Sequence, residues 1–276
     1  MSLRDPAVRI LQSLPRRARA RRRGRTTRWE LRSTAGYRVV ATLHRPDTDA
    51  KVPAVLLCPG TNAPGSVFTG WGEAVQVDEL VSLGVAALRF DPAGRGESWG
   101  PEDYGGDEHQ DNVRVALRRL LDEPGIERVG VLSISLGLTM AVGALARWSD
   151  SLPVEFLLDW EGPCDREIIT AGGTRMAPAL GHRLDDDLYW NPREAVRHVG
   201  KLRCGYLRVQ AERDHAQPGE LRHATRMIEA AAQGQLPWFR LNEHPPGAVP
   251  AAPKWYDGGR SAANRVLLSW IRRLLS

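Results

Sequence analysis

One stretch decides the fold: Arg128–Met140, which reads RVGVLSISLGLTM. Its first part, Arg128–Leu132, is short, apolar and rich in valine, which predicts a buried strand. From Leu136 the chain continues to Trp148 in small and apolar residues, which predicts a helix that packs closely on a sheet. Ser135 lies between these two segments, at the turn from strand to helix.

The residues around Ser135 suit a catalytic serine. A serine hydroxyl is a poor nucleophile unless a sharp turn exposes it next to a base and a helix N-terminus. At such a turn the chain doubles back, so small residues are needed two positions before and two positions after the serine. Gly137 meets this need, and Ser133 stands where a glycine is more usual. The pattern predicts Ser135 as a nucleophile; the alternative is a serine in an ordinary strand-to-helix loop.

Strand-like and helix-like segments alternate along most of the chain. The expected strands are Tyr37–His44, Pro53–Cys58, Val85–Phe90, Arg128–Leu132, Val154–Asp159, Cys204–Gln210 and Leu236–Leu241. The expected helices are Glu73–Leu83, Asp107–Leu121, Leu136–Trp148, Pro218–Ala232 and Ala262–Leu275. Nearly continuous apolar strands separated by helices indicate a parallel sheet that is covered on both faces.

The net charge of +5 conceals a division of the chain into two parts. Residues 1–28 hold ten arginines and one acid, a net charge of +9, so residues 29–276 carry −4. We interpret 1–28 as a basic extension that is solvated or helical. The alternative is a weak contact with polyanions, through counterion release from phosphates or attraction to an anionic membrane.

Composition places the remainder of the chain among soluble globular proteins. Of 276 residues, 42% are hydrophobic and 26% are charged. No apolar run reaches the roughly 18 residues that a membrane helix needs, and no apolar segment follows the N-terminal arginines as an export signal requires. The three cysteines are odd in number and lack metal-type spacing, which predicts free thiols in a reducing compartment, hence the cytoplasm.

Three motifs carry a resemblance to the α/β-hydrolases. They are Leu57–Asn62 (LCPGTN), Phe90–Ser98 (FDPAGRGES) and the turn at Ser135. The chain is most similar to the dienelactone hydrolase and small-cap esterase or peptidase branches, over about residues 30–275. The resemblance implies an α/β fold with a mostly parallel central sheet of about eight strands flanked by helices. In the second motif it implies that Asp91 and Arg95 are framework residues.

The domain organisation follows from the same resemblance. Residues 29–276 are expected to form one α/β-hydrolase domain. Residues 163–200 interrupt the alternation of strands and helices with proline, glycine, aromatic residues and an acidic triplet. We interpret 163–200 as a small cap inserted between two strands. The acidic triplet Asp185–Asp187 is expected to be a solvated turn and not a metal site, because consecutive acids cannot all face one ion.

The family order of catalytic residues is serine, acid, histidine. Asp214 follows the expected strand Cys204–Gln210 and precedes a helix, so the resemblance implies that it is the acid that orients the base. Its alternatives are a helix cap for Asp214 itself, Glu212 as the nearest other acid, and Asp159 or Glu161 after the preceding strand.

The resemblance places the base after the last strand. His244 lies there in a proline-rich loop, and imidazole takes up and returns a proton near neutral pH. The family's glycine before this histidine is absent. His215, next to Asp214, is the rival base. The remaining histidines are expected to be surface or cap residues: His44, His109, His182, His198 and His223.

The rest of the site is also implied by the resemblance. The backbone N–H groups of Leu136 and Thr61 would hold the oxyanion of the tetrahedral intermediate. The Asn62 side chain would add a donor, and Trp160 and Trp190 are candidates for an apolar substrate pocket.

These residues predict a serine hydrolase that cleaves a carboxylic ester of a small molecule through an acyl-enzyme, with no metal, no organic cofactor and no specific nucleic-acid partner. Two other functions stay open. One is hydrolysis of an amide or thioester on the same triad, since only the pocket chooses the substrate. The other is a binding protein without turnover.

Overall fold

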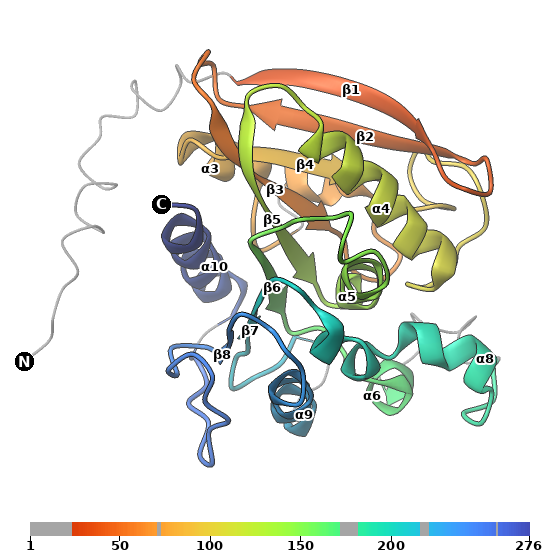
Figure 1. The fold of residues 1–276 in the computed structure, drawn as a ribbon, viewed down its shortest axis with the longest axis vertical. Helices are drawn as coiled ribbons and strands as arrows, with labels where there is room; N and C mark the ends of the chain where they lie inside the picture. Colours follow the sequence, from red (N-terminus) through yellow and green to blue (C-terminus); the bar gives the residue numbers. More distant parts are fainter. Residues whose placement is uncertain (1–23, 71–72, 172–181, 216–220, 258) are drawn as a thin grey trace, which may run out of the picture.

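The computed structural model describes residues 24–70, 73–171, 182–215, 221–257 and 259–276. One eight-stranded sheet runs through the molecule in the order β1-β2-β4-β3-β5-β6-β7-β8 (Figure 1). The strands are β1 (Arg25–Arg32), β2 (Arg38–Arg45), β3 (Val52–Cys58), β4 (Ala86–Phe90), β5 (Ile126–Ile134), β6 (Phe156–Trp160), β7 (Gly205–Val209) and β8 (Phe239–Leu241). The pairs β1–β2 and β2–β4 are antiparallel, and every other pair is parallel.

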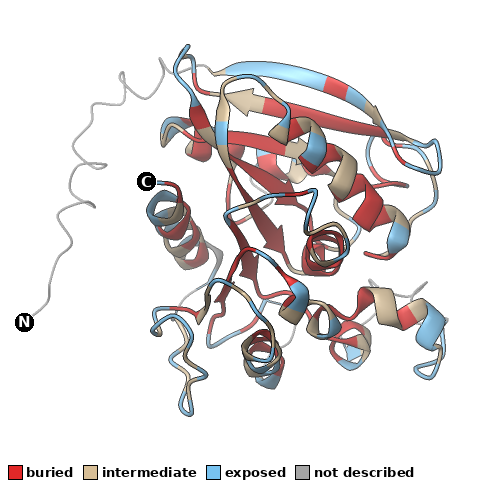
Figure 2. Cartoon of the chain, viewed as in Figure 1, coloured by how far each residue is buried: buried red, intermediate tan, exposed pale blue. Residues whose placement is uncertain are grey.

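Helices cover both faces of this sheet. The side chains of α4 (Asp107–Leu121), α5 (Gly137–Arg147) and α9 (Arg222–Ala232) share one core cluster with one face of the strands. Those of α3 (Val77–Ser82) and α10 (Arg260–Leu275) share a second cluster with the other face. Figure 2 shows the central strands and the inner helix faces as buried, whereas β1 is mostly exposed. The expected fold class is therefore confirmed.

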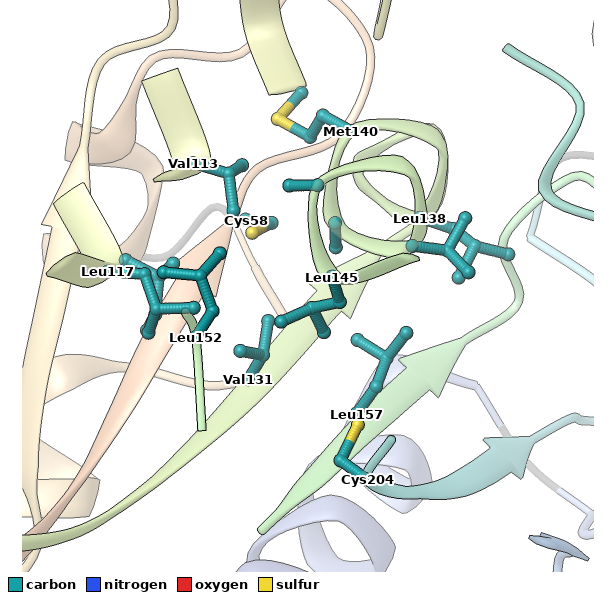
Figure 3. Packing of buried hydrophobic residues seen from close by; sticks show 14 of the residues in the cluster. Cys58, Val113, Leu117, Val131, Leu138, Met140, Leu145, Leu152, Leu157 and Cys204 are labelled. Carbon is teal, nitrogen blue, oxygen red and sulfur yellow. The ribbon is translucent and has the colours of Figure 1, made fainter. Parts of the chain in front are cut away.

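The larger cluster packs the strands against α4 and α5. Figure 3 shows Leu145 of α5 next to Val131 of β5, with Val113 and Leu117 of α4 on one side of them and Leu138 of α5 on the other. Small residues in α5 allow this close approach. A Cβ added at Gly143, for example, would lie 2.4 Å from the Gln110 side chain of α4. The packing fixes where α5 begins, and with it the turn that holds Ser135.

The predicted elements differ from the observed ones mainly at their ends. Helix α4 has the expected bounds, whereas α3 begins four residues later than the expected start at Glu73. Helix α9 begins at Arg222; residues 216–220, which include the expected start at Pro218, lie outside the described residues.

Strand β1 is a correction to the sequence analysis. Its residues read RTTRWELR, and only Trp29 is buried, so the segment lacks the apolar pattern of a core strand. It pairs along its full length with β2 at the edge of the sheet. The boundary placed after residue 28 is therefore wrong, because Arg25 and Arg28 belong to the sheet. Both form ion pairs, Arg25 with Asp47 and Asp49, and Arg28 with Glu97 among others. Residues 1–23 lie outside the described residues.

The described residues between β6 and β7 include several short helices. They are α6 (Arg166–Ala171), α8 (Asp187–Trp190) and the 3-10 turns η3 (Asn191–Arg193), η4 (Ala195–Arg197) and η5 (Val199–Lys201), and residues 172–181 lie outside the described ranges. Another 3-10 turn, η1 (Gly65–Thr69), follows β3. The predicted cap, 163–200, lies in this segment. Among the helices of the described residues, none combines the length and apolarity that a bilayer crossing requires.

Candidate active site

Ser135 lies at a strained turn between β5 and α5, which we call the elbow. Its φ is +52°, a left-handed conformation that is uncommon for residues other than glycine and that often marks a functional site. Its N–H donates a hydrogen bond to the carbonyl of Trp160, the last residue of β6, at 3.0 Å. Helix α5 begins two residues later at Gly137. The strand-turn-helix arrangement is present as the sequence predicts.

The two small neighbours of Ser135 have different reasons to be small. A Cβ at Gly137 would lie 2.5 Å from the carbonyl oxygen of Cys58 and 2.7 Å from that of Pro59, so only glycine fits. Ser133 is fully buried, and its Oγ has no hydrogen-bond partner among the described residues. The turn therefore requires a small residue at position 133 but makes no use of its hydroxyl.

The loop after β3 lies against the serine. A Cβ at Gly60 would be 3.3 Å from the Ser135 Cβ and 4.0 Å from its Oγ. The next N–H along the chain belongs to Thr61. Within the described part of the chain, neither the Thr61 N–H nor the Leu136 N–H donates to a protein acceptor. Both donors predicted for the oxyanion are therefore unpaired among the described residues, and they belong to residues next to Gly60 and Ser135.

The FDPAGRGES motif (Phe90–Ser98) holds the loop after β3 in place through hydrogen bonds. The buried Arg95 donates to the carbonyl of Gly60 at 2.8 Å and forms a two-point ion pair with Glu102. Burial alone would raise the pKa of Glu102, but the hydrogen bonds and charge of Arg95 lower it below its usual value. Asp91 accepts hydrogen bonds from the N–H groups of Gly65 and Glu97, at 2.8 Å each. These contacts give Asp91 and Arg95 the framework role that the resemblance implies.

Glu161, the first residue after β6, is a buried carboxylate with donors on both oxygens. Like Ser135 it has a positive φ, +52°. Its Oε2 lies 2.7 Å from Nδ1 of His215 and accepts the His215 backbone N–H at 3.1 Å. Its Oε1 accepts the N–H of Ala211 at 2.9 Å and the hydroxyl of Tyr256 at 3.1 Å. The carboxylate thus joins the loops that follow β6, β7 and β8.

His215 connects this carboxylate to the elbow. Its imidazole stacks on the Trp160 indole, with 4.9 Å between ring centroids and 21° between planes. The contact with Glu161 assigns a proton to Nδ1 in the neutral ring. Among the described residues, Nε2 has no hydrogen-bond partner, and the side chain is 28% exposed. Trp160 therefore contacts His215 through its ring and Ser135 through its carbonyl.

Asp214, the predicted acid, faces inward beside His215. Its Oδ2 accepts the side-chain amide of Gln210 at 2.9 Å and lies 3.3 Å from Nε2 of His223 on α9. Its Oδ1 lies 3.8 Å from Nδ1 of His215. Asp214 is thus close to two imidazoles, and the nearer one is the buried His223.

His244, the predicted base, follows β8 as expected but has other contacts. Its Nε2 accepts the backbone N–H of Lys254 at 2.8 Å. No hydrogen bond or ion pair joins its ring to Asp214 or to Ser135 within the described ranges. Most residues of 243–254 are exposed. The assignment of His244 as base stays a prediction.

After this loop the chain returns to the site at Tyr256. It pairs there with the loop that follows β7, through an isolated bridge to Ala211 and a hydrogen bond from Glu212 N–H to the Tyr256 carbonyl. The hydroxyl accepts the indole N–H of Trp160 at 2.8 Å and donates to Glu161. Burial, together with the charge of Glu161, raises the pKa of Tyr256. Sequence reasoning missed this tyrosine because no motif marks it.

A fully buried polar network lies under these loops. Arg208 of β7 donates at 2.7 Å to Asp159 of β6, which also accepts the hydroxyl of Tyr206 at 2.7 Å. The other guanidinium nitrogen contacts Gln210 at 2.6 Å and Nδ1 of His223 at 3.1 Å. Burial opposes the charge of Arg208, but the neighbouring Asp159 raises its pKa above the ordinary value. The network fixes the strands from which Glu161 and Asp214 emerge.

Two histidines expected at the surface or in the cap are buried instead, so that expectation is wrong for both. His223 lies within the network described above. His109 of α4 accepts the Gly105 N–H at Nδ1, 3.1 Å, and its Nε2 lies 3.0 Å from the carbonyl of Ala93.

The predicted substrate-contact residues lie in different settings. Asn62 is exposed and has a φ of +55°. Trp160 is buried and contacts His215 and Tyr256, as described above. Trp190 is completely buried against Leu136 and Ile169, with its N–H donated to the carbonyl of Arg183. Both indoles support the site from within, and contact with a substrate stays a prediction for all three residues.

Three ligand-type atoms near the elbow come within 4.8 Å of one another, from Glu161, Asp214 and His215. A zinc ion would lie about 2 Å from each of its ligand atoms. The carboxylate and imidazole of Glu161 and His215 are only 2.7 Å apart, the separation of a direct hydrogen bond. The group is therefore better described as a hydrogen-bonded acid and base, and a metal would have to separate them.

Solved structures match the fold, whereas no family model and no curated protein matches the chain. The esterase Pf2001 of Pyrococcus furiosus gives a TM-score of 0.65 at 15% identity, over 95% of both chains. A puromycin-hydrolyzing peptidase of Mycobacterium tuberculosis gives 0.69 at 16% identity, over 96% of this chain and 41% of that one. The 2,6-dihydroxy-pseudo-oxynicotine hydrolase gives 0.66 at 16% identity, over 91% and 68%. At these identities the likeness concerns architecture alone, and the chain has the α/β-hydrolase fold.

Proposed function

We propose that the chain is a serine hydrolase that cleaves carboxylic esters. The observation that carries this proposal is the conformation of Ser135, which has a φ of +52° between β5 and α5 and lies next to two unpaired N–H donors. A strained, non-glycine residue at that position is a cost of about 1–3 kcal/mol that the surrounding packing must hold in place. A nucleophile explains why the fold retains it.

The reaction follows from these parts. The Ser135 oxygen bonds to the ester carbonyl carbon while its proton passes to a histidine. The Thr61 and Leu136 N–H groups stabilise the oxyanion that forms. The intermediate collapses when the alcohol leaves with the proton, which gives an acyl-enzyme. Water then adds to the acyl carbon while the same histidine takes one of its protons. The bond to Ser135 breaks to release the acid, and the histidine returns the proton to the serine oxygen.

The test is a pair of serine variants two positions apart. Ser135→Ala is expected to abolish turnover of p-nitrophenyl esters and labelling by a fluorophosphonate probe, because the nucleophilic oxygen is gone. Ser133→Ala is the matched control. It removes a buried hydroxyl that has no partner among the described residues, so activity and labelling are expected to persist. Full labelling of the Ser135 variant would refute the proposal, and stoichiometric ligand binding without any labelling would favour a binding protein.

A second substrate class has support from the comparisons. Among the solved structures with this architecture are an esterase and a peptidase that hydrolyses puromycin. The same triad chemistry serves esters, amides and thioesters, and the pocket selects among them. Relative kcat/KM values on matched ester, thioester and aminoacyl-amide panels decide the class. A preference for the amide by more than tenfold would replace the ester assignment while leaving Ser135 in its role.

A further inference from the structure

We infer that the base serving Ser135 is His215, oriented by Glu161, and that Tyr256 positions this acid. The inference rests on the proposed function and names its proton-transfer residues. The family's acid is expected after β7 and its base after β8. In this inference the acid follows β6 and the base follows β7. The usual place of the base, after β8, is then taken by a tyrosine.

His215 is paired with a buried acid, Glu161. A catalytic histidine needs one ring nitrogen held by a carboxylate so that the other is free to take a proton from the nucleophile. His215 has this arrangement. Its Nδ1 is 2.7 Å from the buried Glu161, and its Nε2 has no partner among the described residues. The side chain is partly exposed, at 28%.

Glu161 and His215 are connected to the elbow at Ser135 through Trp160. Strands β5 and β6 are adjacent, with Ile134 opposite Trp160, so Ser135 and Glu161 are the next residues along two paired strands. The Ser135 N–H binds the Trp160 carbonyl, and the Trp160 ring stacks on His215. Glu161, His215 and Ser135 are therefore all next to Trp160, in sequence or in contact.

The acid and base that the resemblance predicts, Asp214 and His244, are not joined by a hydrogen bond or ion pair within the described ranges. The His244 Nε2 is occupied by the Lys254 N–H on an exposed loop. Asp214 accepts the side-chain amide of Gln210 and lies 3.3 Å from the buried His223, whereas His215 is 3.8 Å away. To form the family triad, His244 would have to give up its hydrogen bond to Lys254.

Tyr256 supplies the support that a catalytic carboxylate needs. Its hydroxyl takes the Trp160 N–H and gives its own proton to Glu161 Oε1, so it fixes both the stacking platform and the acid. It touches neither substrate nor base in this arrangement. We therefore describe Tyr256 as a positioning residue.

The experiment compares matched histidine variants in the full chain. His215→Gln is expected to lower kcat/KM for the p-nitrophenyl ester and the rate of fluorophosphonate labelling by at least about 100-fold, the contribution typical of a general base. His244→Gln is expected to leave both within about twofold of the parent. Unchanged thermal unfolding of each variant shows that the fold is retained. A large loss in the His244 variant, whether alone or equal to that of the His215 variant, overturns the inference.

Acid and tyrosine variants give a second readout. Glu161→Gln is expected to lower kcat by at least about 100-fold with little change in KM, since the imidazolium loses its counter-charge in the transition state. Tyr256→Phe is expected to lower kcat about tenfold and to move the acidic limb of the pH profile upward, because Glu161 loses a donor and attracts the protonated ring more strongly. A Phe variant with an unchanged pH profile would mean that Tyr256 is merely structural.

Failure of the inference can be told apart from failure of the proposed function. If Ser135→Ala abolishes labelling but His215→Gln does not slow it, the hydrolase stands and the base is wrong. If Ser135→Ala retains labelling, the hydrolase itself is wrong.

Discussion

Gly137 is the residue whose replacement the elbow tolerates least. Gly137→Ala is expected to reduce esterase activity by more than about tenfold and stability by about 1–3 kcal/mol, the usual cost of overpacking. The reason is that its Cβ would overlap the carbonyl oxygens of Cys58 and Pro59, which carry the loop to Thr61. Rates on p-nitrophenyl esters and denaturant midpoints measure both effects. The control is Gly70→Ala, where nothing lies within 4 Å of the new methyl. Equal behaviour of the two variants would contradict the steric account.

The local sequence predicts the proposed nucleophile, Ser135, but not its proposed base, His215. The requirement for small residues around Ser135 acts within five consecutive positions, so a linear pattern reveals it. The histidine that serves the serine depends on where distant loops return. The sequence places His244 correctly after β8, yet the loop turns its ring to Lys254 and brings Tyr256 back to the site instead. No local pattern encodes that exchange.

At the scale of elements, α4 makes stability depend on pH through His109. Burial, with the nearby Arg95, lowers the pKa of His109 to about 4, below the ordinary value of 6.5. Between these two pH values His109 binds a proton in the unfolded chain but not in the folded chain. The stabilisation is therefore complete above pH 6.5 and is lost as the pH falls to about 4, on the order of 3 kcal/mol in total.

His109→Gln isolates this contribution. The variant is expected to be less stable at pH 7 by about 1–3 kcal/mol, since it satisfies the Gly105 and Ala93 backbone groups less well. Its stability is expected to fall less steeply than that of the parent between pH 6.5 and pH 4. Urea unfolding across that range measures both slopes. Parallel curves for the two proteins would show that His109 does not titrate in this way.

Strands β6 and β7 depend on one buried ion pair. Arg208→Met is expected to cost about 3–5 kcal/mol, because it leaves Asp159 buried without its cationic partner. Urea denaturation measures the loss. Arg183→Met is the control: Arg183 pairs with Asp185 at the surface, with both side chains mostly exposed, so a change within about 1 kcal/mol is expected. A cost for Arg208→Met as small as that of the control would mean that the pair contributes specificity and little stability.

The elements that sequence reasoning found are those with an apolar period. The parallel strands and α4 bury regular apolar faces, and each was predicted within a few residues. Strand β1 was missed because it lies at the antiparallel edge, where its first four residues, Arg25–Arg28, are all exposed and only Trp29 is buried. Its position depends on backbone pairing with β2, which leaves no hydrophobic signal.

At the scale of the whole molecule, the sheet order places the candidate site and strand β1 in separate regions of the fold. Ser135, Glu161 and His215 follow β5, β6 and β7, in the middle and towards one side of the sheet, whereas β1 forms the opposite edge. Residues 1–23 lead into that edge and carry eight arginines and one acid. The arginines that follow, Arg25 and Arg28, are part of β1 and are paired with acids. If the chain contacts polyanions, we therefore expect the contact to depend on the residues that precede β1.

Removal of residues 1–23 separates these two regions by experiment. The truncated chain keeps β1 intact, so ester turnover is expected to stay within about twofold of the parent. Retention on heparin is expected to weaken, because a net charge of +7 is lost with the segment and each neutralised phosphate or sulfate releases counterions. The salt concentration at elution measures the change, and a full-length variant with four of these arginines replaced by glutamine should elute between the two. An unchanged elution position would show that the segment makes no such contact, while a large loss of turnover would mean that it supports the hydrolase domain.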